Sequence, residues 1–311
     1  MEKFINEITA AEIGKISSDE HLTNHTTMKV GGPAEIFVEP ASIEKLQTLM
    51  KLINQYNIDW RVIGRGSNLL VSDNGIRGVV IKLGKGLDHL QVDGTTIRAG
   101  GGFSIIVLAT KMAREGLSGL QFSSGIPGSV GGSVYMNAGA HGSDISKVLT
   151  RAHILFPDGK MEWLTNEEMK FSYRTSILQE ERPGIVIEAE FKLTEAKPEE
   201  IKAEMKKYKD YRKETQPWNH PCSGSIFRNP LPEYAGQLIQ SAGLKGFQIG
   251  GAQVSELHGN FIVNAGGATS KDVQDLIQHI KHTILDANGV EIETEVEWVG
   301  EEAPFTDKLD S

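Results

Sequence analysis

Two glycine-rich stretches are the first feature of this sequence that could do chemistry. The longer, GIPGSVGGSVYMNAGAHG at 125–142, holds six glycines in eighteen residues, and the shorter is GRGSNL at 64–69. Glycine costs backbone entropy on folding, so this density indicates turns with positive φ or a backbone that another molecule approaches closely. Small polar side chains accompany the glycines: Ser67, Asn68, Ser129 and Asn137. Successive N–H groups in such turns can bind phosphate without net positive charge, which predicts a dinucleotide site.

The shorter stretch is not a standard dinucleotide fingerprint. Leu69 stands where the third glycine would be, and a second strand rather than a helix is expected after it. A Rossmann site is therefore disfavoured, and a surface turn is the simpler interpretation of this stretch when it is taken alone.

Three polar residues stand in unusual surroundings. Arg174 lies among hydroxyls in KFSYRTS, Ser225 lies in the proline-bracketed PCSGSIFRNP, and Glu295 lies in EIETEVEWVG, where we expect a strand. Each one separately is explained as well by a surface arginine, a turn serine or an exposed strand glutamate. Only their combination indicates a site.

Thiol and metal chemistry have little support in this sequence. Cys222 is the single cysteine and lies two residues after His220, but no signature of a thiol enzyme surrounds the pair. The nine histidines show neither HExxH nor a Cys/His ligand spacing, so no metal site is predicted. One cysteine also excludes an internal disulfide.

The elements that must position these residues begin as an α/β pattern. Apolar spacing predicts a helix over 3–15 and a second one capped by Ser42, with Leu46, Leu49, Met50 and Ile53 on one stripe. Buried strands are expected at 60–64 and 79–83.

Hairpins and one helix are predicted for the next hundred residues. Asp93-Gly94 indicates a tight turn between two strands, and a second hairpin is expected around the Pro-Asp-Gly turn of 151–165. Between them a helix should run from Ser104 through Glu115 and stop at Gly116. A further strand is expected at 184–193.

A small separate α+β domain is expected after the TEAKPEE segment. Pro198 suits the first turn of a charged helix, whose basic part at 206–213 is more typical of a solvated face than of a binding site. Helices at 234–242 and 270–287 and strands around 251, around 262 and at 290–299 follow, then a loose tail at 301–311.

Composition limits the function classes. The 311 residues are 39% hydrophobic with a net charge of −9, which favours a globular protein and argues against broad nucleic-acid binding. No apolar run approaches the length of a membrane span, and the N-terminus has no signal-peptide pattern. We therefore expect a cytoplasmic protein with neither nucleic-acid partners nor membrane insertion.

Taken in order, six motifs resemble the UDP-N-acetylenolpyruvoylglucosamine reductase family over residues 21–300. They are NHTTMKVGGPA, VIGRGSNLL, GIPGSVGGSVYMNAGAHG, FSYRTS, GSIFRNP and TEVEWVG. The resemblance implies an α+β fold, with a two-lobed FAD-binding region of the vanillyl-alcohol-oxidase type and a small C-terminal substrate domain. The implied divisions are a helix at 1–20, an FAD-binding domain at 21–196 with lobes of about 21–84 and 85–196, a substrate domain at 197–300 and the tail.

The resemblance also implies a reaction and its residues. NADPH would reduce non-covalently bound FAD, and the flavin would reduce the enolpyruvyl ether of a UDP-sugar to UDP-N-acetylmuramate for peptidoglycan synthesis. Arg174 and Glu295 match the groups at the substrate carboxylate, and Ser225 matches the proton donor. The residues matched to FAD are Gly64, Arg65, Gly66, Ser67, Asn68, Leu69, Gly125, Ile126, Pro127, Gly128, Gly131, Gly132, Tyr135, Asn137 and Ala138.

Substrate contacts are implied for Tyr173, Arg228 and Asn229. Arg228 replaces the family's common lysine and is the first candidate for the diphosphate, with 206–213 the second. Thr294 and Glu297 stand where the family often has proline and arginine, which weakens the match around Glu295. The chain has no room for the inserted tyrosine element of one subclass, so we expect the subclass without it.

Two other functions are compatible with part of the sequence. An FAD oxidoreductase of the alcohol-oxidase type would share the flavin fold but needs no GSIFRNP motif. A non-catalytic nucleotide-binding module would retain the glycine-rich stretches but has no use for Arg174, Ser225 and Glu295 together.

Overall fold

The structure is a computed structural model that describes residues 1–301, and the chain divides into two compact units. The first unit comprises 1–18, 36–65 and 78–211, and the second comprises 19–35, 66–77 and 212 onward. Residues 302–311 of the expected tail lie outside the described residues. The domain boundaries expected from the sequence stay a prediction.

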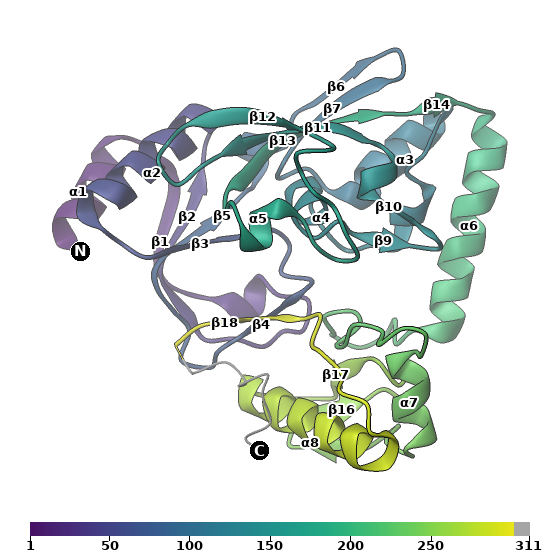
Figure 1. Cartoon of the computed structure of the whole chain (residues 1–311). Helices are drawn as coiled ribbons and strands as arrows, with labels where there is room; N and C mark the ends of the chain where they lie inside the picture. Colours follow the sequence, from purple (N-terminus) through teal and green to yellow (C-terminus); the bar gives the residue numbers. More distant parts are fainter. Residues whose placement is uncertain (302–311) are drawn as a thin grey trace. The chain divides into compact units, whose positions relative to one another are not determined.

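A four-stranded sheet in the order β1-β2-β5-β3 forms one layer (Figure 1). Its strands are β1 (Gly14–His21), β2 (Pro33–Pro40), β3 (Trp60–Ile63) and β5 (Ile76–Lys82), and β3 pairs with β5 in parallel. Helices α1 (Glu2–Ala10) and α2 (Ile43–Tyr56) share a core with β2 and β5. The expected helix after Ser42 is confirmed, because Ser42 Oγ accepts a hydrogen bond from the N–H of Lys45 at 3.2 Å.

The leading helix is shorter than the predicted 3–15. It ends at Ala10, Glu12 takes a positive φ of 50°, and strand β1 begins at Gly14. A Cβ at Gly14 would lie 2.1 Å from the carbonyl oxygen of Glu39, so the close passage of β2 requires glycine here and stops the helix. Strands β1 and β2 were not predicted.

An antiparallel five-stranded sheet in the order β12-β11-β13-β7-β6 is the second layer of the first unit. The strands are β6 (Leu90–Asp93), β7 (Thr96–Gly100), β11 (Leu149–Leu155), β12 (Met161–Thr165) and β13 (Ile185–Lys192). Both predicted hairpins are confirmed, the first with Asp93 paired to Thr96 and Gly94 at φ +55°.

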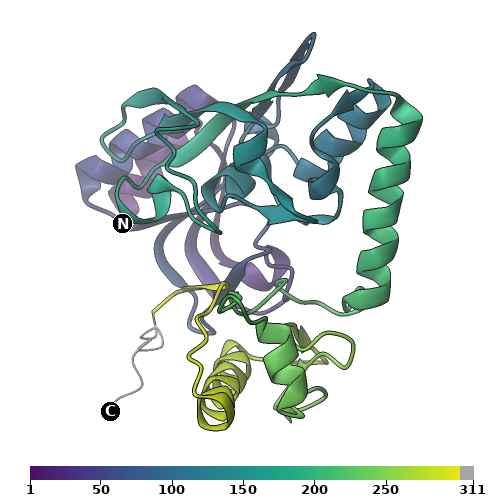
Figure 2. The ribbon, with the colours of Figure 1, turned by 45° about the vertical axis from the view of Figure 1, so that its right-hand side comes forward.

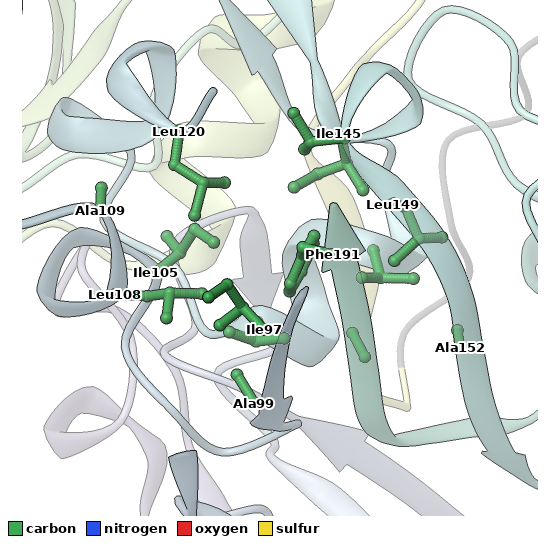
Figure 3. Packing of buried hydrophobic residues seen from close by; sticks show 14 of the residues in the cluster. Ile97, Ala99, Ile105, Leu108, Ala109, Leu120, Ile145, Leu149, Ala152 and Phe191 are labelled. Carbon is green, nitrogen blue, oxygen red and sulfur yellow. The ribbon is translucent and has the colours of Figure 1, made fainter. Parts of the chain in front are cut away.

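Helix α3 (Ile105–Arg114) forms where the sequence predicts a helix, and it covers this sheet and shares its core. Figure 3 shows Ile105 and Leu108 of α3 beside Ile97 of β7, with Phe191 of β13 in the same core. The other short elements here are η2 (Lys85–Leu87), β8 (Leu117–Ser118), η3 (Gln121–Gly125), α4 (Val130–Tyr135), β9 (Gly139–Ala140), β10 (Ser143–Asp144), η4 (Ile145–Lys147), α5 (Ile177–Glu180) and β14 (Thr194–Glu195).

Helix α6 (Pro198–Thr215) begins at the proline that the sequence indicated and is one continuous helix (Figure 2). Its first turn carries Glu199 and Glu200, and its last turn carries Arg212 and Lys213. This charge order complements the helix dipole at both ends.

The second unit is built around helices α7 (Ala235–Ser241) and α8 (Ser270–Asn288), which lie side by side (Figure 2). They share a core with the small sheet of β15 (Gln248–Ile249), β16 (Ala252–Val254) and β17 (Ile262–Asn264). The turn η1 (Leu22–Asn24) also belongs here, as do β4 (Leu69–Val71) and β18 (Glu297–Val299), which pair in parallel.

The strand predicted over 290–299 is wrong in extent. Only the three residues of β18 form a ladder, whereas the preceding residues meet 226–228 through a single bridge between Phe227 and Thr294. Among residues 1–301 no helix is long and apolar enough to cross a membrane.

Candidate active site

The glycine-rich stretch 125–142 is not one loop. Gly125 ends η3, Ile126 to Gly128 form a connection, and α4 holds Gly131, Gly132 and Tyr135. Asn137 and Ala138 follow this helix. Ser129 Oγ accepts the N–H of Gly132 at 3.2 Å, so the serine caps the helix. The sequence analysis missed α4 because its two glycines disfavour a helix by propensity, whereas the cap and its packing on β13 support it.

Two glycines lie close against neighbouring backbone. A Cβ at Gly131 would lie 3.0 Å from the carbonyl oxygen of Gly101, and one at Gly66 would lie 2.2 Å from that of His25. The N–H of Gly131 donates to Gly101 at 2.9 Å. Residues 100–102 are thus a third glycine run beside α4, which the sequence analysis did not assign to the site.

The two predicted glycine stretches meet at one point within the first unit. A Cβ at Gly64 would come 2.4 Å from Ser129 Oγ, the capping hydroxyl of α4. Gly64 and the exposed Arg65 belong to the first unit, whereas the remaining residues of that stretch, Gly66, Ser67, Asn68 and Leu69, belong to the second.

The segment around α4 has the features expected where a cofactor binds. In the described part of the chain, the hydroxyls of Ser124 and Ser133 are buried without a hydrogen-bond partner. Buried polar groups are normally paired, so these two hydroxyls indicate a missing polar ligand. A Cβ at Gly132 would meet only Ser129 Oγ, at 3.3 Å, so the backbone there is open to close approach. These residues fit a cofactor such as FAD.

Arg174 lies at the tip of a tight turn. Ser172 and Thr175 exchange two backbone hydrogen bonds of 3.1 and 3.2 Å around Tyr173 and Arg174, and Arg174 takes φ +58°. Its NH2 group donates to the carbonyl oxygen of Gly139 at 2.8 Å, and its guanidinium carbon lies 5.1 Å from the ring centre of Tyr173. The turn therefore presents a fixed cation beside a half-exposed aromatic ring.

The segment after α4 holds this turn in place. Asn137 Nδ2 donates to the carbonyl oxygen of Ser172 at 2.9 Å, and Asn137 Oδ1 accepts the N–H of Ser146 at 3.0 Å. The carbonyl oxygen of Tyr135 accepts from Ser176 Oγ at 2.7 Å and from Gln179 Nε2 at 2.8 Å. The structure thus brings Tyr135 and Asn137, predicted at the cofactor, to the predicted catalytic Arg174.

Ser225 and Glu295 come together within the second unit. The N–H of Glu295 donates to the carbonyl oxygen of Ile226 at 2.7 Å, directly after Ser225. Gly224 precedes the serine with φ +79°, a conformation that favours glycine. Glu295 itself is not in a strand, contrary to expectation: it lies between the Thr294 bridge and β18.

Asn68 contacts the backbone of Glu295 and Glu297. Its Nδ2 donates to the carbonyl oxygen of Glu295 at 3.0 Å, and its own carbonyl oxygen accepts the N–H of Glu297 at 2.9 Å. This residue was predicted at the cofactor, and the structure adds hydrogen bonds to the backbone of the candidate catalytic Glu295 and of Glu297. Leu69 continues the contact as the first residue of β4, opposite Glu297.

The predicted substrate residues Arg228 and Asn229 follow in the same segment. The N–H of Arg228 donates to the carbonyl oxygen of Glu293 at 2.9 Å, which fixes its backbone. Asn229 Oδ1 accepts the N–H of Ala235 at 3.2 Å at the start of α7. Arg174 belongs to the first unit and the other two candidate catalytic residues to the second, so each is described within its own unit.

Cys222 has the properties of a structural thiol. Burial raises the pKa of its thiol, although the nearby Arg212 guanidinium acts in the opposite direction. A raised pKa disfavours the thiolate that a nucleophile requires, which argues against the Cys–His alternative. The same desolvation lowers the pKa of the half-buried Arg212 guanidinium.

Comparison with known proteins shows that two domain families match different parts of this chain. Residues 216–299 match the C-terminal domain of UDP-N-acetylenolpyruvoylglucosamine reductase, and residues 34–165 match an FAD binding domain. The chain is 62% identical over 302 residues to the UDP-N-acetylenolpyruvoylglucosamine reductase of Bacillus pumilus, covering 97% of this chain and all of that protein. It is 60% identical over 300 residues to that of Bacillus subtilis, covering 96% and 99%.

Solved structures agree in fold. The UDP-N-acetylenolpyruvylglucosamine reductase of Thermus caldophilus superposes with a TM-score of 0.77 at 37% identity, covering 91% of this chain and 98% of that one. A variant of Phl p 4 described as a glucose oxidase has a TM-score of 0.50 at 16% identity over 63% of this chain and 44% of that one. With the FAD-binding match, these comparisons confirm the expected α+β fold with its flavin-binding region of the vanillyl-alcohol-oxidase type.

Proposed function

The chain belongs to the UDP-N-acetylenolpyruvoylglucosamine reductase family, and from this premise we propose that Arg174, Ser225 and Glu295 carry its chemistry. It is a flavin-dependent oxidoreductase that reduces UDP-N-acetylenolpyruvoylglucosamine to UDP-N-acetylmuramate, with NADPH as the reductant. Family membership decides against the alcohol-oxidase and binding-module alternatives.

The reaction adds a hydride and a proton across a carbon–carbon double bond. FAD, which the residues around α4 would hold, would supply this hydride to the terminal alkene carbon of the enolpyruvyl ether, with NADPH as its source. The electron pair of the double bond then resides on the carbon that carries the carboxylate, as an enolate. The chain must stabilise this charge and deliver one proton to that carbon.

Arg174 is proposed to stabilise the enolate at the substrate carboxylate. Its positive φ turn and its hydrogen bond to Gly139 hold the guanidinium in one orientation. A cation that is already oriented stabilises the enolate more than a mobile one, because it does not have to reorganise as the negative charge develops. Loss of one such group lowers the rate about 10²–10³-fold. Glu295 is proposed to act with Arg174 at the same substrate carboxylate.

Ser225 is proposed to deliver the proton. A serine hydroxyl is a weak acid, so it can protonate only a strong base at fixed geometry, and an enolate provides that base. The observation that carries this proposal is the 2.7 Å bond from Glu295 N–H to the carbonyl oxygen of Ile226. It ties the chain immediately after the donor to the carboxyl residue.

Substrate binding is proposed for Tyr173, Arg228 and Asn229. Arg228 is the first candidate for the diphosphate, and the basic part of α6 at 206–213 is the second. Nucleotide sugars and NADPH are metabolites of the cytoplasm, so we place the reaction there. The net charge of −9 supports a protein without nucleic-acid partners.

Separate half-reactions test the proposal. Ser225→Ala should bind FAD and bleach with NADPH at close to the wild-type rate. Reoxidation by the enolpyruvyl substrate should be slowed about 10²-fold or more, the range for a positioned acid or base. Ser225→Cys should recover part of the loss, because a thiol also donates.

Stopped-flow spectra of both half-reactions are the measurement. Equal damage to the two half-reactions would indicate a serine that only shapes the turn. Wild-type reoxidation in Ser225→Ala would end the proton-donor assignment.

A further inference from the structure

One buried asparagine is bonded to the two residues that follow Ser225. Asn260 is 4% exposed and precedes β17. Its Oδ1 accepts the N–H of Phe227 at 2.9 Å, and its Nδ2 donates to the carbonyl oxygen of Phe227 at 2.8 Å. Its main-chain carbonyl oxygen accepts the N–H of Ile226 at 2.9 Å. Three hydrogen bonds thus hold two consecutive residues.

The opposite edge of the same segment is held by the chain around Glu295. The carbonyl oxygen of Ile226 accepts the N–H of Glu295, and Arg228 N–H donates to Glu293. Residues 226–228 therefore lie between Asn260 on one edge and 293–295 on the other. The segment is the direct link between Ser225 and the candidate carboxyl group.

An amide side chain is needed at Asn260 because no strand continues there. Phe227 is 1% exposed, so its N–H and C=O have no access to water. A side-chain amide offers the same donor and acceptor as a peptide group, and it occupies the place of the missing strand partner. Removing it would leave both backbone groups of Phe227 buried and unpaired, which is costly. The two bonds also set the direction of the chain next to Ser225.

We propose that Asn260 is a positioning residue for the proton-transfer step. By holding residues 226 and 227, it keeps the Ser225 hydroxyl and the Glu295 carboxyl group at a constant separation while the enolate forms. This inference rests on the roles proposed above for Ser225 and Glu295. Catalytic geometry is sensitive to such support, since a shift of about 1 Å can cost about 10²-fold in rate.

Two variants test the proposal on the FAD-loaded enzyme. Asn260→Ala removes both side-chain bonds, whereas Asn260→Asp keeps an acceptor for Phe227 N–H and places an oxygen, instead of the donor, against the carbonyl oxygen of Phe227. Reoxidation of the reduced flavin by the enolpyruvyl substrate should slow about 30-fold in the first and about tenfold in the second, within the range for a displaced catalytic group. Reduction by NADPH should change less than about twofold in both. If Asn260→Ala does not fold, Asn260→Asp carries the test.

Amide hydrogen exchange gives a readout that is independent of activity. Exchange in the 224–229 segment should become faster in Asn260→Ala, because Phe227 N–H loses its acceptor. Asn264→Ala is the matched control in the same unit. The Asn264 side chain bonds to Met28, Gly266 and Ala268 instead, so its loss should lower stability and leave reoxidation close to wild type.

A double-mutant cycle separates positioning from general stabilisation. In a Ser225→Ala background the group that Asn260 positions is gone, so Asn260→Ala should slow reoxidation by less than about threefold further. The same 30-fold factor in both backgrounds, or unchanged reoxidation in Asn260→Ala, would overturn the inference. Failure of the proposed function itself would be seen separately, as wild-type reduced enzyme that the enolpyruvyl substrate does not reoxidise.

Discussion

Asn137 holds the Arg174 turn through the carbonyl oxygen of Ser172, and the cost of replacing it can be worked out from the structure. The side chain is 4% exposed, makes two hydrogen bonds of 2.9 and 3.0 Å, and belongs to a residue with φ +43°. Each bond contributes about 1 kcal/mol net, and alanine at positive φ costs about 1 kcal/mol. Asn137→Ala should therefore lower the free energy of unfolding by about 3 kcal/mol.

A glycine variant separates the loss of the two hydrogen bonds from the cost of the positive φ. Asn137→Gly loses the same hydrogen bonds but tolerates the positive φ, so it should cost about 2 kcal/mol. Asn57 is the matched control, since it ends α2 at φ +49° with an exposed side chain that makes no hydrogen bond within residues 1–301. At Asn57 no hydrogen bond is lost, so the alanine variant should be less stable than the glycine variant by about 1 kcal/mol, from the positive φ alone.

Replacing Asn137 should also lower activity, because it weakens the turn that carries Arg174. Without Asn137 Nδ2 the carbonyl oxygen of Ser172 keeps only the Thr175 N–H as a donor, so the turn that orients Arg174 is held less firmly. We expect kcat/KM for the UDP-sugar to fall about tenfold, with reoxidation by the substrate slowed more than flavin reduction by NADPH. Urea unfolding followed by circular dichroism measures stability, and stopped-flow absorbance measures the half-reactions.

Two results would refute this reasoning. Equal stability of Asn137→Ala and Asn137→Gly would show that the left-handed backbone is not a constraint. A loss below about 0.5 kcal/mol in Asn137→Ala would show that the two hydrogen bonds contribute little, since surface substitutions lie in that range.

Two further predictions concern charged groups. Hydrogen bonds from Arg151, and then from Arg98, hold the pKa of the Glu190 carboxyl below its ordinary value. The ionised carboxylate therefore stabilises the fold above about pH 4.5, and this stabilisation is lost as pH falls through the lowered pKa. Glu190→Gln should therefore destabilise by about 1 kcal/mol at pH 7 and less at pH 3; thermal unfolding at both pH values measures this, and an equal loss at each contradicts it. Arg228→Ala should raise the KM for the UDP-sugar about tenfold with a smaller change in kcat, as loss of uniform binding does; an unchanged KM at low salt would remove Arg228 from the diphosphate.

Local elements of this protein follow from local sequence. The helix after Ser42, the Asp93-Gly94 hairpin and the helix beginning at Pro198 depend on caps, turn residues and apolar spacing within a few positions. Because those signals lie in neighbouring residues, they can be recognised without knowing which distant residues the segment contacts. The family and its reaction were also determined by sequence, because six ordered motifs specify them together. The subclass without an inserted tyrosine element stays a prediction.

Contacts between residues far apart in the chain could be found only from the tertiary structure. No local pattern indicates that Gly14 must be glycine because Glu39 passes it, or that α4 forms despite two glycines. The same holds for Asn260, which substitutes for a strand partner of Phe227 33 positions away. Its side chain has no local signature, because the donor and acceptor that it satisfies come together only when the second unit folds. Burial makes these pairings decisive, since a backbone group that is removed from water must find a partner wherever the fold provides one.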